Sequence, residues 1–204
     1  ASQPAVGEIT FAGRETLSFR NSHLPALAPY TNFGSEYAII FAISVGDQSI
    51  EGAINEAVFE LVDGTGFQRV RNGASDAFTY SVHTRTPVGS GQAFSSVSAP
   101  APIDQVRVYT LVNTGDTVVR SISGAVVSSD RHFIDLSGWS PVFTLGDLDN
   151  SFQTAMPHQF CESVCLRAGT LDERQRAEAL MAFRWGAPLD AAHPYAGRQA
   201  EFSL

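Results

Sequence analysis

The chain has 204 residues and a formal net charge of -8, from 21 acidic side chains against 13 basic ones, and it contains no Lys. An acidic surface of this kind is a poor binder of phosphate backbones, so we expect no nucleic-acid partner. No apolar run approaches the length of a membrane-spanning helix, so we expect no membrane partner. The length suits one all-β domain with a core of its own.

Short segments rich in β-branched and aromatic residues recur between Gly- and Asn-containing turns along the whole chain. This rhythm is typical of an all-β domain with two sheets. We expect strands at 8–12, 16–19, 37–45, 57–62, 67–70, 78–84, 106–112, 118–127, 142–145 and 158–166.

Two of these segments indicate which faces are buried. Residues 37–43 are apolar on both faces, which predicts a central strand covered on both sides. Residues 106–113 alternate between a strongly apolar face and a mixed face. Two other stretches, 86–102 and 130–157, depart from the strand rhythm, and we interpret them as long loops, which often carry function.

The only cysteines, Cys161 and Cys165, lie on one face of the strand expected at 158–166, about 13 Å apart. That separation exceeds what a disulfide tolerates, so we expect two free thiols; only a helical path would bring them closer. Free thiols suit folding in a reducing cytoplasm, although exported bacterial domains also often lack disulfides.

A single helix is predicted after this strand. Thr170 and Glu173 have capping-box spacing, residues 171–184 contain neither Gly nor Pro, and Gly186 and Pro188 end the pattern. The helix therefore has about four turns.

The segment from Asp172 to Gly186, DERQRAEALMAFRWG, followed by Pro188-Leu189 and His193-Pro194-Tyr195, resembles the end of laminin G-like domains. The resemblance is specific over about forty residues and looser elsewhere, and it covers 8–196. It implies an all-β, concanavalin A-like (laminin G-like) jelly-roll sandwich with one C-terminal helix closing one end. The departures are Leu180-Met181, where the family usually has Tyr-Leu, and Arg184, where Lys is usual.

The same resemblance suggests roles for several residues near this helix. Glu162, on the preceding strand, is expected to satisfy backbone N–H groups or to meet an Arg such as Arg184, with ligand contact as the alternative. Trp185 is expected in the core. His193-Pro194-Tyr195 is expected to pack back on the sandwich.

Catalytic patterns are missing from the sequence. Glu56 and Glu60 are four residues apart and do not form the alternating carboxylate pattern of jelly-roll glycosidases. The five histidines have no metal-ligand spacing, and no nucleophile elbow or phosphate loop occurs. We therefore expect a protein that is not an enzyme; a degenerate hydrolase or lyase is the third and weakest hypothesis.

A calcium site is one candidate for ligand binding. Asp147, Asp149 and Asn150 cluster carboxylate and amide oxygens in one turn, the ligands that calcium prefers. Laminin G-like modules, which the chain resembles, often hold calcium at a loop rim. The alternative is a solvated turn in which Gly and Asp serve only the backbone.

Sugar binding is the other candidate. Sugar rings stack on exposed aromatic faces, and the candidates are Trp139, Tyr30, Phe94 and Tyr109. Each of the four can instead be a core or interface residue.

The leading functional hypothesis is a virion-surface structural protein of a phage or phage-like particle, a capsid decoration or a head or tail fibre component. It would fold in the host cytoplasm and bind capsid or tail proteins as a homo-oligomer, with cell-surface polysaccharide as a further partner. Residues 1–7 would form an N-terminal docking arm and 8–204 one laminin G-like domain. The alternative is a secreted, extracellular bacterial carbohydrate-binding, lectin-like module.

Overall fold

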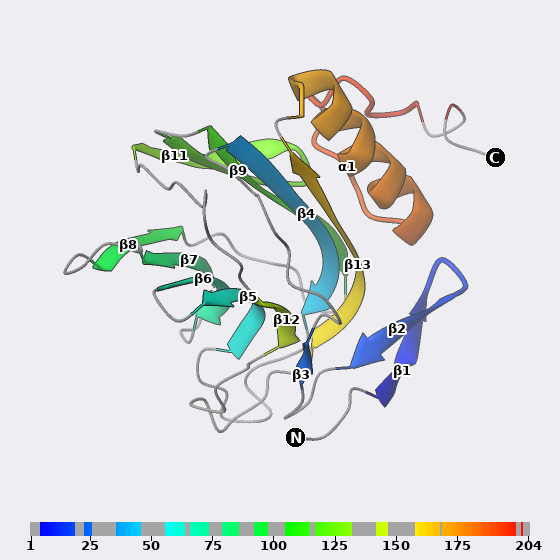
Figure 1. Cartoon of the computed structure of the whole chain (residues 1–204). Helices are drawn as coiled ribbons and strands as arrows, with labels where there is room; N and C mark the ends of the chain where they lie inside the picture. The colour runs from blue at the N-terminus through cyan, green and yellow to red at the C-terminus, as the bar shows by residue number, and fades with distance from the viewer. Residues whose placement is uncertain are drawn as a thin grey trace.

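The structure, a computed structural model, describes residues 5–18, 23–25, 36–45, 56–63, 66–73, 79–85, 92–97, 105–114, 117–131, 142–146, 158–167, 169–198 and 201. These residues form two antiparallel sheets and one helix (Figure 1). No helix among them is long and apolar enough to span a membrane.

The larger sheet has seven strands in the order β1-β2-β13-β4-β9-β10-β11. Their bounds are β1 Ala5–Phe11, β2 Arg14–Ser18, β13 His158–Arg167, β4 Glu36–Val45, β9 Val106–Thr114, β10 Thr117–Ile122 and β11 Ala125–Arg131. The strand at the end of the chain, β13, therefore lies between two early ones, β2 and β4.

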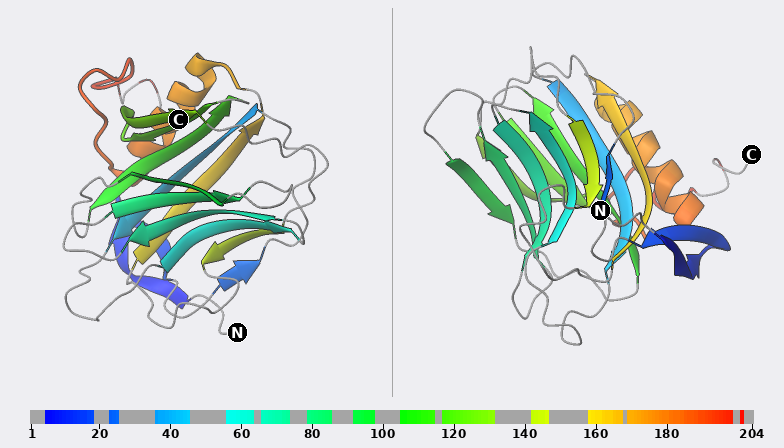
Figure 2. Two further views of the ribbon diagram at one scale, coloured as in Figure 1. Left: turned by 90° about the vertical axis from the view of Figure 1, so that its left-hand side faces the viewer. Right: turned by 60° about the horizontal axis from the view of Figure 1, so that its bottom comes forward.

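The smaller sheet has six strands in the order β3-β12-β5-β6-β7-β8. Their bounds are β3 His23–Pro25, β12 Val142–Gly146, β5 Glu56–Asp63, β6 Gly66–Gly73, β7 Thr79–Arg85 and β8 Gln92–Val97. The two sheets face each other, with the larger one curved around the smaller (Figures 1 and 2). The fold is a concanavalin A-like jelly-roll sandwich, as the sequence predicts.

The central strand of the larger sheet is β4, which pairs with β13 on one side and β9 on the other. Residues 37–44 are all buried, which confirms a strand covered on both faces. On β9 the expected mixed face is buried too, except for the half-buried Arg107: Tyr109 stacks on Phe41 of β4 with ring centroids 5.4 Å apart. Apolar contact on both faces of these two strands explains why they form the centre of the core.

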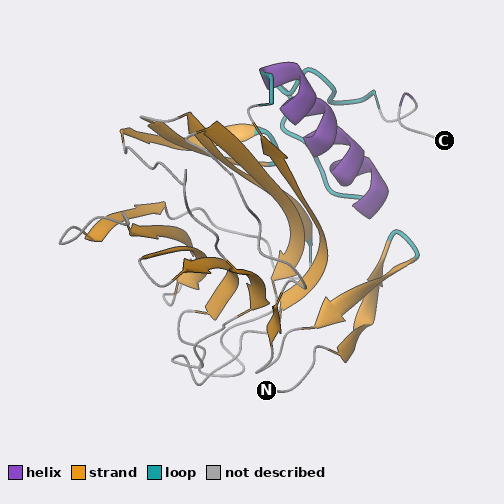
Figure 3. Cartoon of the chain, in the orientation of Figure 1, coloured by secondary structure: helices purple, strands orange, loops and turns teal. Residues whose placement is uncertain are grey.

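The helix α1, Leu171–Trp185, lies on the outer face of the larger sheet, against β4, β9 and β13 (Figures 1 and 3). It covers this face rather than an open end of the sandwich. The buried residues of this interface are Ile40, Ala42, Val106 and Val108 from the sheet with Met181, Ala182 and Trp185 from the helix. Trp185 is thus a core residue, as expected.

Both helix ends match the signals in the sequence. Thr170 Oγ1 accepts the N–H of Glu173 at 3.2 Å, and the Glu173 carboxylate accepts the N–H of Thr170 at 2.7 Å. At the other end Gly186 adopts φ 67°, and its N–H points to the carbonyls of Ala182 and Phe183. The capping box and the glycine stop are both confirmed.

The strand predictions fail at several places. The segment expected as one strand at 118–127 is two strands, because Ser123 and Gly124 adopt φ of 53° and 87° and form a tight hairpin turn. The expected loop at 86–102 contains β8, and β3 was not predicted.

The expected docking arm also overlaps a strand. β1 begins at Ala5, so Ala5 and Val6 pair with Ser18 and Leu17 of β2. Residues 5–7 belong to β1, residues 1–4 lie outside the described part of the chain, and a docking role for 1–7 stays a prediction.

Candidate functional site

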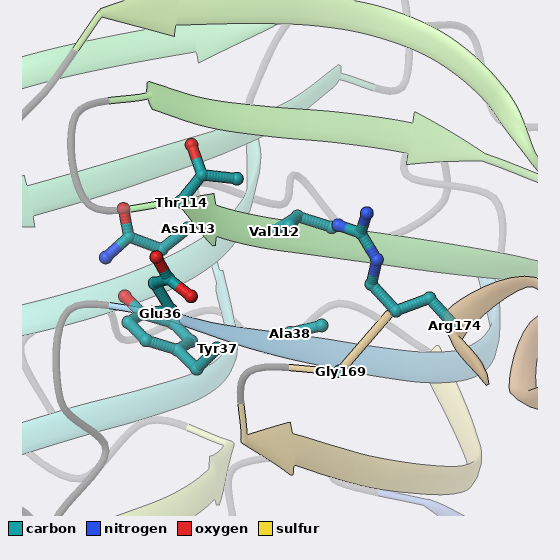
Figure 4. A pocket seen from close by; sticks show the side chains of 8 residues that line it. All are labelled: Glu36, Tyr37, Ala38, Val112, Asn113, Thr114, Gly169 and Arg174. Carbon is teal, nitrogen blue, oxygen red and sulfur yellow. The ribbon is translucent and has the colours of Figure 1, made fainter. Parts of the chain in front are cut away.

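A small pocket lies where the first residues of β4 and the last residues of β9 meet the beginning of α1 (Figure 4). Its volume is about 140 Å³. The pocket is lined by Glu36, Tyr37, Ala38, Val112, Asn113, Thr114, Gly169 and Arg174. Three separate segments of the chain therefore build it.

Strand register brings these residues together. Glu36 pairs with Thr114 and Ala38 pairs with Val112 in the antiparallel ladder between β4 and β9. On the other side of β4, Arg167 at the end of β13 pairs with Tyr37, so the chain reaches Gly169 beside the pocket. The capping box then starts the helix and places Arg174 in its first turn.

The pocket has a charged group at each side. Figure 4 shows Glu36 beside Tyr37 and Asn113, and Arg174 across from them, with Ala38 and Val112 between. Ala38 and Val112 are buried and give the pocket an apolar part, while Asn113 contributes an amide and Thr114 a hydroxyl. The pocket combines apolar and polar groups as small-molecule sites do, but it is smaller than the roughly 300–1,000 Å³ of most such sites.

Arg174 differs from the other arginines of the helix. Arg176 pairs with Asp172 and Arg184 pairs with Glu162. Among the described residues no carboxylate lies within ion-pair distance of Arg174, and its enclosed Nε has no hydrogen-bond partner. Glu36 has no described ion-pair or hydrogen-bond partner either. Within the part of the chain that the structure describes, neither charge is paired.

A second polar cluster lies beneath the helix and is closed to solvent. Glu178 is 5% exposed; its carboxylate accepts a hydrogen bond from Thr110 Oγ1 at 2.5 Å and lies 3.1 Å from His193 Nε2. Ser121 Oγ lies 3.4 Å from the same carboxylate. Since Thr110 and Ser121 belong to the sheet and His193 to the tail, this cluster ties three parts of the fold together.

Glu162 has the structural role that the sequence predicts. Its carboxylate pairs with the guanidinium of Arg184 and accepts the indole N–H of Trp185 at 2.8 Å. Glu162 therefore fixes the end of α1 on β13 and is engaged by protein groups.

The tail after the helix packs back on the sandwich, as expected. Tyr195 is buried, its hydroxyl donates to Asp172 at 2.8 Å, and the guanidinium groups of Arg176 and Arg198 lie over its ring. The hydrogen bond from Tyr195 lowers the pKa of Asp172 and raises the pKa of the phenol. These contacts hold the tail against the first turn of α1.

Cys161 and Cys165 are free thiols on β13, which confirms both the strand and the predicted lack of a bridge between them. Burial raises the pKa of Cys161 to about 12, with the neighbouring Glu162 carboxylate as a smaller cause. Burial likewise raises the pKa of Cys165 to about 11. Neither thiol has the thiolate character of a nucleophile at neutral pH.

Most residues predicted for ligand binding lie outside the described part of the chain. This holds for Tyr30 and Trp139, and for the expected calcium ligands Asp147, Asp149 and Asn150. Among the residues that the structure does describe, no group of three or more His, Cys, Asp or Glu side chains could hold a metal ion.

The other two aromatic candidates lie on strands. Phe94 belongs to β8, where it pairs with His83 of β7, and its side chain lies outside the described part of the structure. Tyr109 is 4% exposed and stacks on Phe41, so its ring offers no open face to a sugar. The core role, given above as the alternative for Tyr109, is the one that the structure shows.

Sequence reasoning missed every residue of the pocket as a functional candidate. Glu36 and Arg174 are 138 positions apart, and only the pairing of β13 with β4 brings their segments together. The one local signal is Arg174 in the first helical turn, where acidic side chains suit the helix dipole better than basic ones.

No protein-family model and no curated protein matches the sequence. Solved structures do match the fold. Domain 4 of AbnA, an extracellular arabinanase from Geobacillus stearothermophilus, solved in complex with arabinotriose, matches with a TM-score of 0.51 and 14% identity, over 80% of this chain and 74% of that one.

Two further structures are similar. A heptameric SAP-like pentraxin from Limulus polyphemus matches with a TM-score of 0.55 and 10% identity, over 88% of this chain and 83% of that one. The binding domain of botulinum neurotoxin serotype G matches with a TM-score of 0.62 and 12% identity, over 92% of this chain. The present chain spans about half, 48%, of that binding domain. At these identities the similarity shows the jelly-roll fold alone.

Proposed function

We propose that this chain is a carbohydrate-binding, lectin-like module that binds sugar through the pocket between Glu36 and Arg174. The observation that carries the proposal is the pocket itself. It combines an apolar floor with a carboxylate, a guanidinium, an amide and a hydroxyl, and the two charged groups have no described partner. Sugars present both apolar C–H faces and many hydroxyl groups, so they need this mixture of contacts.

The similar structures support this class of function. Domain 4 of the arabinanase is described as bound to arabinotriose, and it shares the sandwich over most of both chains. Because one fold can host many functions, this similarity supports sugar binding only together with the pocket.

Binding without cleavage is part of the proposal. Glycosidases need two carboxyl groups about 5–10 Å apart on either side of the scissile bond. Of the described residues that line the pocket, Glu36 is the only acidic one. Glu162 and Glu178, the acids of β13 and the inner face of α1, are held by Arg184 and His193.

A glycan array probed with the purified chain tests the proposal, followed by calorimetric titration of each sugar that binds. We expect selective binding to a small group of glycans and no release of reducing ends from a panel of polysaccharides. Failure to bind any glycan at millimolar concentration would refute sugar binding, and turnover of any polysaccharide would refute the non-catalytic role.

The virion-surface role that the sequence analysis favours stays a prediction, as do the capsid or tail partners and the homo-oligomer. None of the similar structures named above is described as a virion component, and the one described with a bound sugar, domain 4 of the arabinanase, supports the lectin-like alternative. Mass spectrometry of purified particles from the source organism would test the virion placement.

A further inference from the structure

We propose that the pocket binds a single uronic acid residue, with the sugar carboxylate on Arg174 and ring hydroxyl groups on Glu36. This inference rests on the proposed function, because it specifies which sugar the lectin-like module takes. It is argued from the charges, the size and the lining of the pocket.

The first step is the uncompensated charge of Arg174. A guanidinium that is partly removed from water is costly unless an anion or several acceptors pair with it. Arg176 and Arg184 satisfy this requirement with Asp172 and Glu162, whereas Arg174 has no described anion within reach. Arg174 also belongs to the pocket lining, so an anion that enters the pocket would supply the missing partner.

The second step is the position of Glu36. The two charged groups lie on opposite sides of the pocket and do not form an ion pair with each other (Figure 4). A ligand that contacts both must therefore offer an anion at one end and hydrogen-bond donors at the other. A neutral sugar offers donors for Glu36 but only hydroxyl oxygens for Arg174, while a uronic acid offers both kinds of group.

The third step concerns the size of the pocket and the residues at its bottom. The pocket, of about 140 Å³, is too small to enclose more than one sugar ring. Ala38 and Val112 close the bottom of the pocket but are 1% and 8% exposed, so most of the contact with the ring must come from the polar groups. Thr114 adds a hydroxyl oxygen at the rim, and its proton is donated to the Thr117 carbonyl at 3.2 Å. We therefore expect the uronic acid to be a monosaccharide or the terminal residue of a polysaccharide.

The fourth step is overall charge. At -8 the protein repels anions in general, so an acidic ligand needs a local cation to bind. Arg174 supplies that cation within the pocket. Binding of an acidic sugar should thus depend on this one side chain far more than on any other Arg.

The test compares methyl glucuronide with methyl glucoside, which differ only in the carboxylate, and uses glycine as a probe that carries both charges without a sugar ring. Calorimetry gives the affinities, and amide chemical shifts of Gly169 and Thr114 report contact with the pocket. We expect glucuronide to bind at least about tenfold more tightly than glucoside, which is the effect of one charge-assisted hydrogen bond. Equal affinity for the two sugars at these amides would overturn the uronate assignment and leave sugar binding intact.

Substitutions of single arginines then test which side chain binds the sugar carboxylate. Arg174→Gln should lose about tenfold or more for glucuronide and much less for glucoside, so that the preference between the two sugars disappears, while Arg174→Lys should retain part of the preference. Arg176→Gln is the matched control, because Arg176 lies on the same helix, is 64% exposed and does not line the pocket.

Two results would contradict the assignment to Arg174. One is glucuronide binding that survives in folded Arg174→Gln, and the other is tighter binding of glycine than of glucuronide. A third outcome is that no sugar binds and neither amide shifts. That outcome would refute sugar binding itself, whereas the first two would refute only the assignment of a uronic acid to Arg174.

Discussion

The carboxylate of Glu178 lies 3.1 Å from Nε2 of His193, and the two side chains are 7% and 1% exposed. Glu178 comes from α1, and His193 comes from the tail that returns after the helix. Because the same carboxylate also accepts a hydrogen bond from Thr110 of β9, it links helix, tail and sheet at one buried point. The position of α1 on the sandwich therefore depends on a polar contact as well as on apolar packing.

His193→Ala tests this contact. The substitution leaves the Glu178 carboxylate buried with only hydroxyl partners, so we expect it to lower the free energy of unfolding by about 3 kcal/mol. Urea denaturation followed by tryptophan fluorescence would measure the change.

Glu201→Gln provides the control for an ion pair of the same tail that is open to water. The Arg198–Glu201 pair is about half exposed on both sides, so its loss should change stability by less than about 1 kcal/mol. If His193→Ala were as mild as Glu201→Gln, the buried contact would not be what fixes the tail.

Gly124→Ala should be among the most destabilising changes of a small residue. A Cβ at this position would lie 2.3 Å from Cδ2 of His193, and the backbone has φ +87°. Steric overlap and left-handed strain together predict a loss of about 3 kcal/mol. Gly13→Ala is the matched control: its φ is +73° but nothing lies within 4 Å, so we expect about 1 kcal/mol.

A double variant separates the two causes. In Gly124→Ala with His193→Ala the clash is removed, so the second substitution should cost less than the two single effects added together. Strict additivity of the two losses would mean that the imidazole is not what crowds Gly124.

The elements with strong local signals were predictable from the sequence. Thr170, Glu173 and Gly186 set both ends of α1 through backbone hydrogen bonds within a few residues, and these are the contacts that the structure shows. Likewise the apolar run 37–43 predicts the central strand, because burial on both faces removes the usual alternation.

The features that depend on distant residues were not predictable. The hairpin at Ser123-Gly124 was missed because apolar residues continue on both sides of it, and the Ser-Gly signal was outweighed. Glu178 looks like an ordinary helix-surface acid until Thr110 and His193 meet it. The pocket was unpredictable for the same reason, because Glu36 and Arg174 come together only through the pairing of β13 with β4.

The partly buried thiols of Cys161 and Cys165 predict a loss of stability at high pH. Burial raises the pKa of Cys161 to about 12 and of Cys165 to about 11, against an ordinary value of 9.0. The folded state therefore holds protons that the unfolded state has lost, so the stabilisation is complete below pH 9 and disappears as the pH rises towards 11–12. We expect the free energy of unfolding to fall between pH 9 and pH 11.

The comparison is a Cys161→Ala/Cys165→Ala double variant. Its free energy of unfolding should fall less steeply over the same pH range, measured by urea denaturation at several pH values. Parallel slopes for the two proteins would show that other groups, such as tyrosines, account for the whole decline.

Thr170→Ala tests whether the capping box supports the pocket. The substitution removes the side-chain acceptor for the Glu173 N–H, so we expect it to cost about 1 kcal/mol. Thr170→Ser keeps the hydroxyl oxygen and should cost much less. Because the first turn carries Arg174, fraying of this turn should also speed hydrogen exchange at the Arg174 amide, whose N–H bonds to the Thr170 carbonyl at 3.1 Å. Equal exchange rates in the Ala and Ser variants would show that packing of the helix on the sheet, and not the cap, holds Arg174 at the pocket.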